Sequence, residues 1–277
     1  MFGKLLKHDF KAIYKNALPL SLSALVASVI GGLSISIMTK VDLKSDILAI
    51  IFTLATILSY LVVISAPIGI LILIYMHFYK NLFTDEGYLT FALPVKRSSI
   101  LLSKTVNAMI WTATSVVLTF VLIIISILSA GEFSTVADIF KTIFSLFKFS
   151  SFMEAVWLIL YTIVLILIAV AFTALQINLI QFCITFGSTV VKKHKILASI
   201  GIYYVTNYVL STAATILVML SSRPIAKLFA AISIAEPNLY LAVILLILII
   251  VFAVIAAVAV ALYSMSLRRI KYKLNIS

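Results

Sequence analysis

Six long stretches of this sequence contain no charged residue and no histidine, and they constrain the fold more than any other feature. About 20 apolar residues are enough for a helix to cross roughly 30 Å of hydrocarbon. The stretches cover residues 17–38, 47–76, 106–130, 155–186, 196–220 and 239–267. Because they are continuous apolar runs, not strands of about ten residues with alternating polarity, they predict helices. We therefore expect an all-α membrane protein with six transmembrane helices, forming a single domain over 1–277.

The net charge of +12 is distributed unevenly around these stretches. With six spans, both termini lie on one side of the membrane. That side holds these basic residues: Lys4, Lys7, Lys11, Lys15, Lys80, Lys96, Arg97, Lys104, Lys192, Lys193, Lys195, Arg268, Arg269, Lys271 and Lys273. The opposite side holds fewer: Lys40, Lys44, Lys141, Lys148, Arg223 and Lys227. The positive-inside rule therefore predicts a plasma-membrane protein with both termini cytoplasmic, and anionic lipid accounts for the charge without nucleic acid.

The N-terminal segment 1–16 predicts an interfacial amphipathic helix. Its lysines, such as Lys4, Lys7 and Lys11, fall on one helical face, whereas Phe10 belongs to an apolar face. Such a helix lies on the membrane surface, with its apolar face toward the lipid. Pro19 follows near the start of the first span, where proline disturbs a helix least.

Two of the spans carry features of their own. In the first, small residues recur every fourth position and would allow a close helix contact, either within the chain or with another subunit; they are Ala24, Ser28, Gly32 and Ser36. The second span, at 30 residues, is about 45 Å long if straight. It must therefore tilt, kink at Pro67 or project into the cytosol.

The fourth and fifth spans contain the polar residues of greatest interest, Asn178, Gln181, Tyr204 and Asn207. Hydrogen bonds between helices are the commoner role of such residues, and a substrate path is the alternative. The lone cysteine, Cys183, cannot form an internal disulfide and is expected to be a small core residue. The connection between the third and fourth spans is rich in phenylalanine, which suggests an amphipathic lipid anchor or, less simply, a substrate gate; the residues are Phe133, Phe140, Phe144, Phe147, Phe149 and Phe152.

Several kinds of chemistry are not supported by the sequence. No Asp, Glu, Lys, Arg or His falls within the six apolar stretches, which weakens the case for an ion-coupled transporter or an intramembrane protease. His8, His77 and His194 lack metal-ligand spacing, so no metal site is expected. No G-x-x-x-x-G-K-[ST] motif for ATP occurs. We therefore expect no catalytic site, no enzyme activity and no cofactor on this chain.

The most mixed segment is KNLFTDEGYLTFALPVKRSSILLSK, residues 80–104, inside the predicted cytoplasmic loop 77–105. It combines charges with apolar anchors, as a protein docking site does. The residues of interest are Asp85, Glu86, Gly87, Tyr88, Leu89, Phe91, Pro94, Lys96 and Arg97. A solvated loop with an interfacial helix is the alternative.

Three segments resemble the six-span permeases of type-2 ABC exporters, common in Gram-positive bacteria. They are NLFTDEGYLTFALPV at 81–95 with SSILLSK at 98–104, the start MFGKLLKHDFKA, and KKHKILASIGIYYVTNYVL at 192–210. The resemblance implies a permease subunit that pairs with a second copy or a related permease and binds two ABC ATPase subunits, which carry ATP and Mg²⁺. It also implies that Asp85 to Arg97 form the coupling helix and that the N-terminal helix contacts the ATPase.

This resemblance leads to the functional expectation for the chain. It would be the permease of an exporter whose amphiphilic substrate is a hydrophobic peptide, an antibiotic or a lipid, driven by a separate ATPase. The alternative is an ATP-independent membrane protein, either a secondary transporter or a lipid-packing accessory factor.

Overall fold

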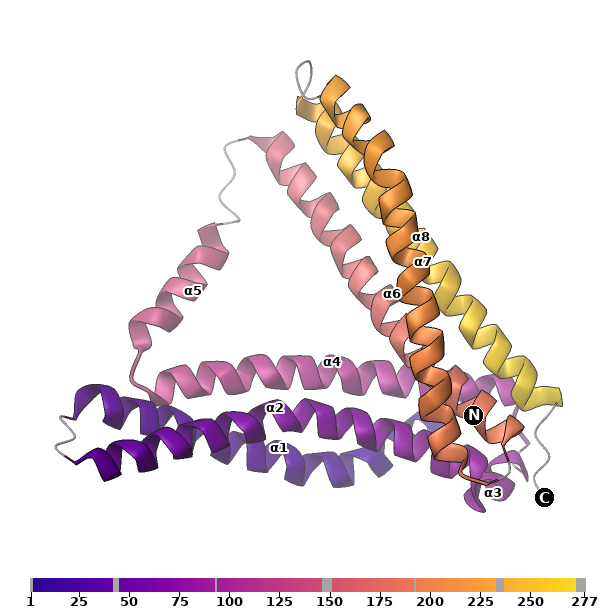
Figure 1. Ribbon diagram of the computed structural model, residues 1–277, viewed down its shortest axis with the longest axis horizontal. Helices are drawn as coiled ribbons and strands as arrows, with labels where there is room; N and C mark the ends of the chain where they lie inside the picture. The colour runs from indigo at the N-terminus through magenta and orange to yellow at the C-terminus, as the bar shows by residue number, and fades with distance from the viewer. Residues whose placement is uncertain are drawn as a thin grey trace. The chain divides into compact units, whose positions relative to one another are not determined.

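The computed structural model describes residues 2–41, 45–92, 94–145, 151–191, 193–232 and 237–272. Throughout these residues the regular structure is helical, without strands (Figure 1). The helices are α1 (Phe2–Lys40), α2 (Asp46–Phe83), α3 (Glu86–Ala92), α4 (Arg97–Ser129), α5 (Phe133–Ser145), α6 (Phe152–Val190), α7 (Lys195–Ile232) and α8 (Pro237–Tyr272). Among the described residues, six of them are long and apolar enough to cross a membrane, namely α1, α2, α4, α6, α7 and α8. The prediction of an all-α, six-span fold is confirmed.

The predicted N-terminal helix and first span have different bounds in the structure. A single helix, α1, runs from Phe2 to Lys40 with Pro19 inside it, so residues 2–16 of the amphipathic segment form its first turns. Pro19 removes one helical hydrogen bond and its ring crowds the carbonyl four residues earlier, but this is a single interruption of the helix. Between Lys15 and Ser23 there is no glycine or second proline that would also break the helix. Continuing the helix lets the remaining backbone N–H and C=O groups form hydrogen bonds within it.

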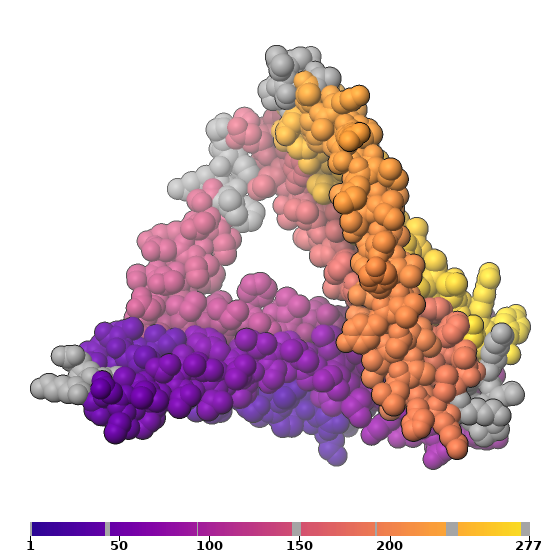
Figure 2. All heavy atoms as spheres, viewed as in Figure 1, coloured from indigo at the N-terminus to yellow at the C-terminus, as the bar shows by residue number. Residues whose placement is uncertain are grey.

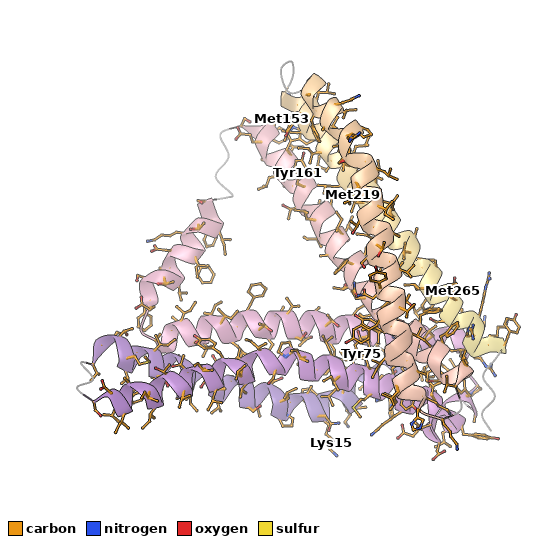
Figure 3. All side chains as sticks on the ribbon, in the orientation of Figure 1. Lys15, Tyr75, Met153, Tyr161, Met219 and Met265 are labelled. Carbon is orange, nitrogen blue, oxygen red and sulfur yellow. The ribbon has the colours of Figure 1, made fainter. Side chains whose placement is uncertain are left out.

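Large apolar side chains cover much of the outside of these helices, which is the reverse of a water-soluble protein. Leu58, Val117 and Leu220, for example, are 61 %, 62 % and 70 % exposed. Met219 of α7, labelled in Figure 3, is 69 % exposed. Such a surface is stable when lipid covers it, so the chain is a multi-pass membrane protein.

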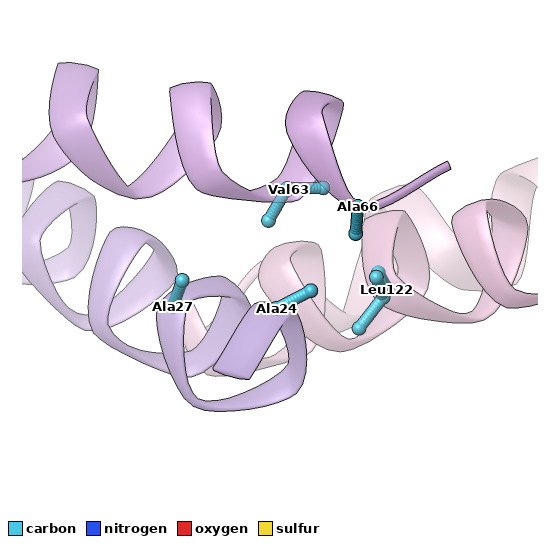
Figure 4. Packing of buried hydrophobic residues seen from close by; sticks show 5 residues of the cluster. All are labelled: Ala24, Ala27, Val63, Ala66 and Leu122. Carbon is cyan, nitrogen blue, oxygen red and sulfur yellow. The ribbon is translucent and has the colours of Figure 1, made fainter. Parts of the chain in front are cut away.

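The chain divides into two compact units, and each is described by itself. The first comprises residues 1–78 and 102–149. One cluster of its core is rich in alanine: Ala24 and Ala27 of α1 face Val63 and Ala66 of α2 and Leu122 of α4 (Figure 4). Alanine on facing helices lets the backbones approach closely, which favours association in lipid.

The small-residue stripe of α1 forms a contact within this unit. Ser28 Oγ donates to the Leu122 carbonyl at 2.6 Å, and both groups are buried. A Cβ added to Gly32 would collide with the Ser126 carbonyl and the Ser129 side chain of α4. Ala24 is fully buried and Ser36 half-buried. Of the two alternatives for this stripe, the structure supports packing inside the chain.

The second unit comprises residues 79–101 and 150–277. Here α6 packs against α8 and α7, and Cys183 is buried beside Leu179 and Leu262. Cys183 therefore occupies the core position expected from the sequence. Near the opposite end of the same helices, the Tyr161 hydroxyl donates to the Leu241 carbonyl at 2.6 Å.

Candidate functional site

The short helix α3 follows directly from the end of α2. The turn between them is closed by the Gly87 amide, which donates to the Thr84 carbonyl at 2.8 Å. Gly87 is buried, and a Cβ there would lie only 2.8 Å from the Leu82 carbonyl oxygen. A larger residue would push the two helices apart. Glycine therefore allows α3 to pack directly on the last turn of α2.

Two apolar side chains of α3 are almost uncovered. Tyr88 is 67 % exposed and Leu89 is 75 % exposed. Around them, Asp85, Glu86, Pro94 and Lys96 are also exposed, whereas Phe91 is half-buried. The predicted segment thus presents an exposed tyrosine and an exposed leucine at consecutive positions among polar residues, and tyrosine is enriched in protein-binding hot spots.

Arg97 was expected to belong to the same docking surface, but it makes contacts inside the chain. Its Nη1 donates to the carbonyls of Ile270 at 2.8 Å and Lys271 at 2.9 Å, in the last turn of α8. Its guanidinium also lies 5.4 Å from the centre of the Phe91 ring. The last carbonyls of a helix lack intrahelical partners and carry partial negative charge. Arg97 satisfies two of them and joins the start of α4 to the end of α8.

A second contact joins the same elements. The Tyr263 hydroxyl of α8 donates to the Ser98 carbonyl of α4 at 3.2 Å. Together with Arg97, it holds the segment after α3 against the last turns of α8.

The N-terminal residues named in the sequence analysis fall into two groups. Lys4, Lys7 and Lys11 are exposed. Phe10, in contrast, stacks on Trp111 of α4, with the ring centres 4.9 Å apart. The basic face is therefore free to meet lipid or a partner, while Phe10 helps to hold α1 against α4.

The four polar residues considered for a substrate path do not share one surface. Asn178 and Gln181 are buried, and Asn178 Nδ2 donates to the Ala259 carbonyl of α8 at 3.1 Å. Tyr204 and Asn207 lie on the exposed surface of α7. Asn178 thus has the interhelical role that its residue type favours.

A buried charge cluster is the feature that sequence reasoning missed. Asp9 of α1 is 4 % exposed and Lys104 of α4 is 7 % exposed. Asp9 Oδ1 lies 2.7 Å from Lys104 Nζ and 3.2 Å from His77 Nε2 of α2. Ser103 Oγ donates to Asp9 Oδ2 at 3.2 Å. Three helices of the first unit therefore meet at one carboxylate.

A signal for this cluster was present in the sequence. At about 100° per residue, Asp9 projects from the side of α1 opposite Lys4, Lys7 and Lys11, among apolar residues such as Ile13. A carboxylate on the buried side of a helix needs a cationic partner. That partner, Lys104, lies far away in the sequence, so periodicity alone could not identify it.

Metal-ligand chemistry finds no support in the described part of the chain. No group of three or more His, Cys, Asp or Glu side chains there is placed to hold a metal ion. In comparisons with known proteins, no family model matches the chain, and neither does any curated protein or solved structure.

Proposed function

We propose that this chain is the permease subunit of an ATP-driven ABC exporter of the type-2 class. In this proposal it moves an amphiphilic substrate, such as a hydrophobic peptide, an antibiotic or a lipid, out across the cell membrane. ATP and Mg²⁺ are bound by two separate ATPase subunits, and a second permease copy or a related permease completes the complex. Both termini and α3 face the cytoplasm. The single observation that carries the proposal is the exposed pair Tyr88 and Leu89 on α3.

This pair has the properties of an anchor for a protein partner. Both side chains are exposed by about two thirds or more. A partner that covers them removes their apolar surface from water, which favours binding. The pair lies outside the six uncharged stretches of the sequence, so hydrocarbon does not cover it in the predicted topology. An ATPase groove that receives both side chains would hold α3 firmly.

The contacts of α3 also explain how a partner would act on the spans. Gly87 packs α3 on Leu82 of α2, so a displacement of α3 acts directly on the end of that helix. Arg97, five residues after α3, is tied to the end of α8. A partner bound to Tyr88 and Leu89 would therefore act on two membrane helices from one docking point.

The decisive experiment is purification of the tagged chain from its native host, followed by identification of any bound P-loop ATPase and assay of ATP hydrolysis. The variant Tyr88→Ala with Leu89→Ala should remain folded and lose the ATPase, since each truncated anchor costs on the order of 1–3 kcal/mol of docking. Tyr208→Ala is the matched control, because Tyr208 is 71 % exposed on α7. An ATPase that stays bound to the double variant, or none bound to the wild type, would contradict the proposal.

The buried Asp9 cluster favours a second candidate, an ATP-independent secondary transporter. Titratable groups inside a helical bundle can couple proton movement to a conformational change. Asp9, His77 and Lys104 are such groups, although all three lie outside the six uncharged stretches. Transport that continues in vesicles without any ATPase, and stops in Asp9→Asn, would favour this candidate.

A further inference from the structure

Within the first unit, the other described residues leave the helix α5 almost entirely uncovered. Every residue from Phe133 to Ser145 is exposed except Val136, which is half-buried. Phe133 and Phe144 are each 68 % exposed, and Phe140 is 47 % exposed. On the face seen in Figure 2, the side chains of α5 are uncovered by the other helices of the first unit. A helix with so much uncovered aromatic surface requires an apolar environment.

The residues of α5 are sorted completely by polarity. At about 100° per residue, the apolar side chains occupy one arc of about 160°, and the polar side chains occupy a separate arc of about 120°. The apolar face consists of Phe133, Val136, Ala137, Ile139, Phe140, Ile143 and Phe144, and the polar face of Ser134, Thr135, Asp138, Lys141, Thr142 and Ser145. On the polar face, Lys141 Nζ lies 3.1 Å from Asp138 Oδ1, and both side chains are well exposed. Such a helix fits a boundary between water and an apolar phase.

The start of α5 lies beside the ends of two membrane helices of its own unit. Helix α4 ends at Ser129, and Gly131, with φ of 80°, turns the chain into α5. A Cβ on Gly131 would collide with Lys40 Nζ, so the last residue of α1 reaches the same level. A lysine directly after an apolar span marks the edge of the hydrocarbon, where its ammonium reaches the headgroups.

We propose that α5 binds the bilayer surface, lying in the headgroup region with its phenylalanine and isoleucine side chains inserted toward the acyl chains. The occupant of its apolar face is therefore lipid, and not a protein. Continuity with α1 and α4 supports this, because the helix begins at the membrane edge, where its apolar face is within reach of lipid. An amphipathic helix placed there inserts its apolar face into the interface and leaves its charges in water. This inference is independent of the proposed ATPase partner.

The binding has a structural consequence for the connection between α4 and α6. Those helices are joined by residues 130–151, of which α5 is the described regular part. An interfacial α5 would hold residues 133–145 of this connection flat on the membrane. The helix α5 would then anchor the end of α4 at the membrane surface and would not extend into the solvent.

Site-directed spin labelling of the full chain tests the proposal. Single cysteines are introduced in a Cys183→Ser background, at Phe140 and Ile143 on the apolar face and at Ser134 and Thr142 on the polar face. The labelled protein is reconstituted in vesicles of phosphatidylcholine and phosphatidylglycerol. Accessibility to oxygen, which concentrates in lipid, is compared with accessibility to a water-soluble nickel chelate. Circular dichroism confirms that each labelled protein is folded.

The two faces should give opposite results. Labels at Phe140 and Ile143 should be accessible to oxygen and protected from nickel, while labels at Ser134 and Thr142 should show the reverse. Nickel access to all four labels would place α5 in water and overturn the proposal. Immobile labels at Phe140 and Ile143 that neither reagent reaches would show that protein covers this face, for example a second copy of the chain, and would also overturn it. Oxygen access to all four would exclude an interfacial position.

Discussion

Lys104 Nζ lies 2.7 Å from Asp9 Oδ1, although 95 residues separate them in the sequence. The pair joins α1 to α4, and His77 adds α2 through its 3.2 Å contact with the same carboxylate. A buried charge without a partner is not tolerated between packed helices, because desolvating a carboxylate costs several kcal/mol. The Asp9 cluster therefore fixes which faces of α1, α2 and α4 meet.

Removing one member of this pair should destabilise the chain strongly. Asp9→Ala leaves the Lys104 ammonium without its carboxylate, and breaking a buried pair in this way costs about 3–5 kcal/mol. Thermal unfolding in detergent measures the loss.

The double variant Asp9→Leu with Lys104→Met is the control for this prediction. Replacing both charges by apolar groups of similar size should recover most of the stability, because no buried charge remains. If Asp9→Ala melts like the wild type, the ion pair does not stabilise the bundle.

A second prediction concerns the contact between α1 and α4. Gly32→Ala should destabilise the first unit, since the added methyl collides with the Ser126 carbonyl, which is backbone and moves only with α4. Overpacking of this kind costs roughly 1–3 kcal/mol. Thermal unfolding measures the effect.

Gly201→Ala is the matched control for Gly32→Ala. Gly201 lies in α7 with nothing within 4 Å of its Cβ position, so alanine should be neutral or slightly stabilising there. Equal melting of the wild type and Gly32→Ala would mean that α1 and α4 are not in close contact at this position.

The distribution of charge predicted the helices well, and the contacts between them poorly. Runs without charge, such as 47–76, identified α2 because length and hydropathy are local properties. The contact of Arg97 with Ile270 depends on how α4 and α8 lie in space, which no local pattern encodes. Tyr88 and Leu89 were selected as candidate anchors because a charged turn with apolar residues stands out in so apolar a chain.

The ends of the helices were also not predicted by the local distribution of charge. The apolar stretch 106–130 predicts a span but not the nine residues by which α4 begins earlier, at Arg97. Lys104 lies in this added part, and it was assigned to a cytoplasmic loop because charge was taken to end a span. In the structure, the helix continues and the charge is neutralised by Asp9.

Membrane topology can be tested with cysteines in a Cys183→Ser background. In intact cells an impermeant thiol reagent should label cysteines at Ser134 and Ser222, both exposed, because the fifteen-to-six distribution of basic residues places them outside. A cysteine at Lys193, also exposed, should react only after the cells are permeabilised. Labelling of Lys193→Cys in intact cells would reverse the orientation.

The final prediction concerns the link between α3 and α8. Arg97→Met keeps the length of the side chain near Phe91 and removes both hydrogen bonds to the Ile270 and Lys271 carbonyls. Because Arg97 is largely exposed, water can replace part of what is lost, and the local cost should be only about 1 kcal/mol. The last turn of α8 should therefore exchange its amide hydrogens several-fold faster, while the melting temperature changes little.

Lys96→Met is the matched control for this link. It removes a neighbouring exposed charge for which the structure gives no contact with α8. If Arg97→Met exchanges like the control, Arg97 does not hold the end of α8. If the exchange rises and an ATPase still binds but no longer drives transport, then the Arg97 contact transmits the movement of α3. Tyr88 and Leu89 would in that case provide attachment and Arg97 the connection to the membrane helices.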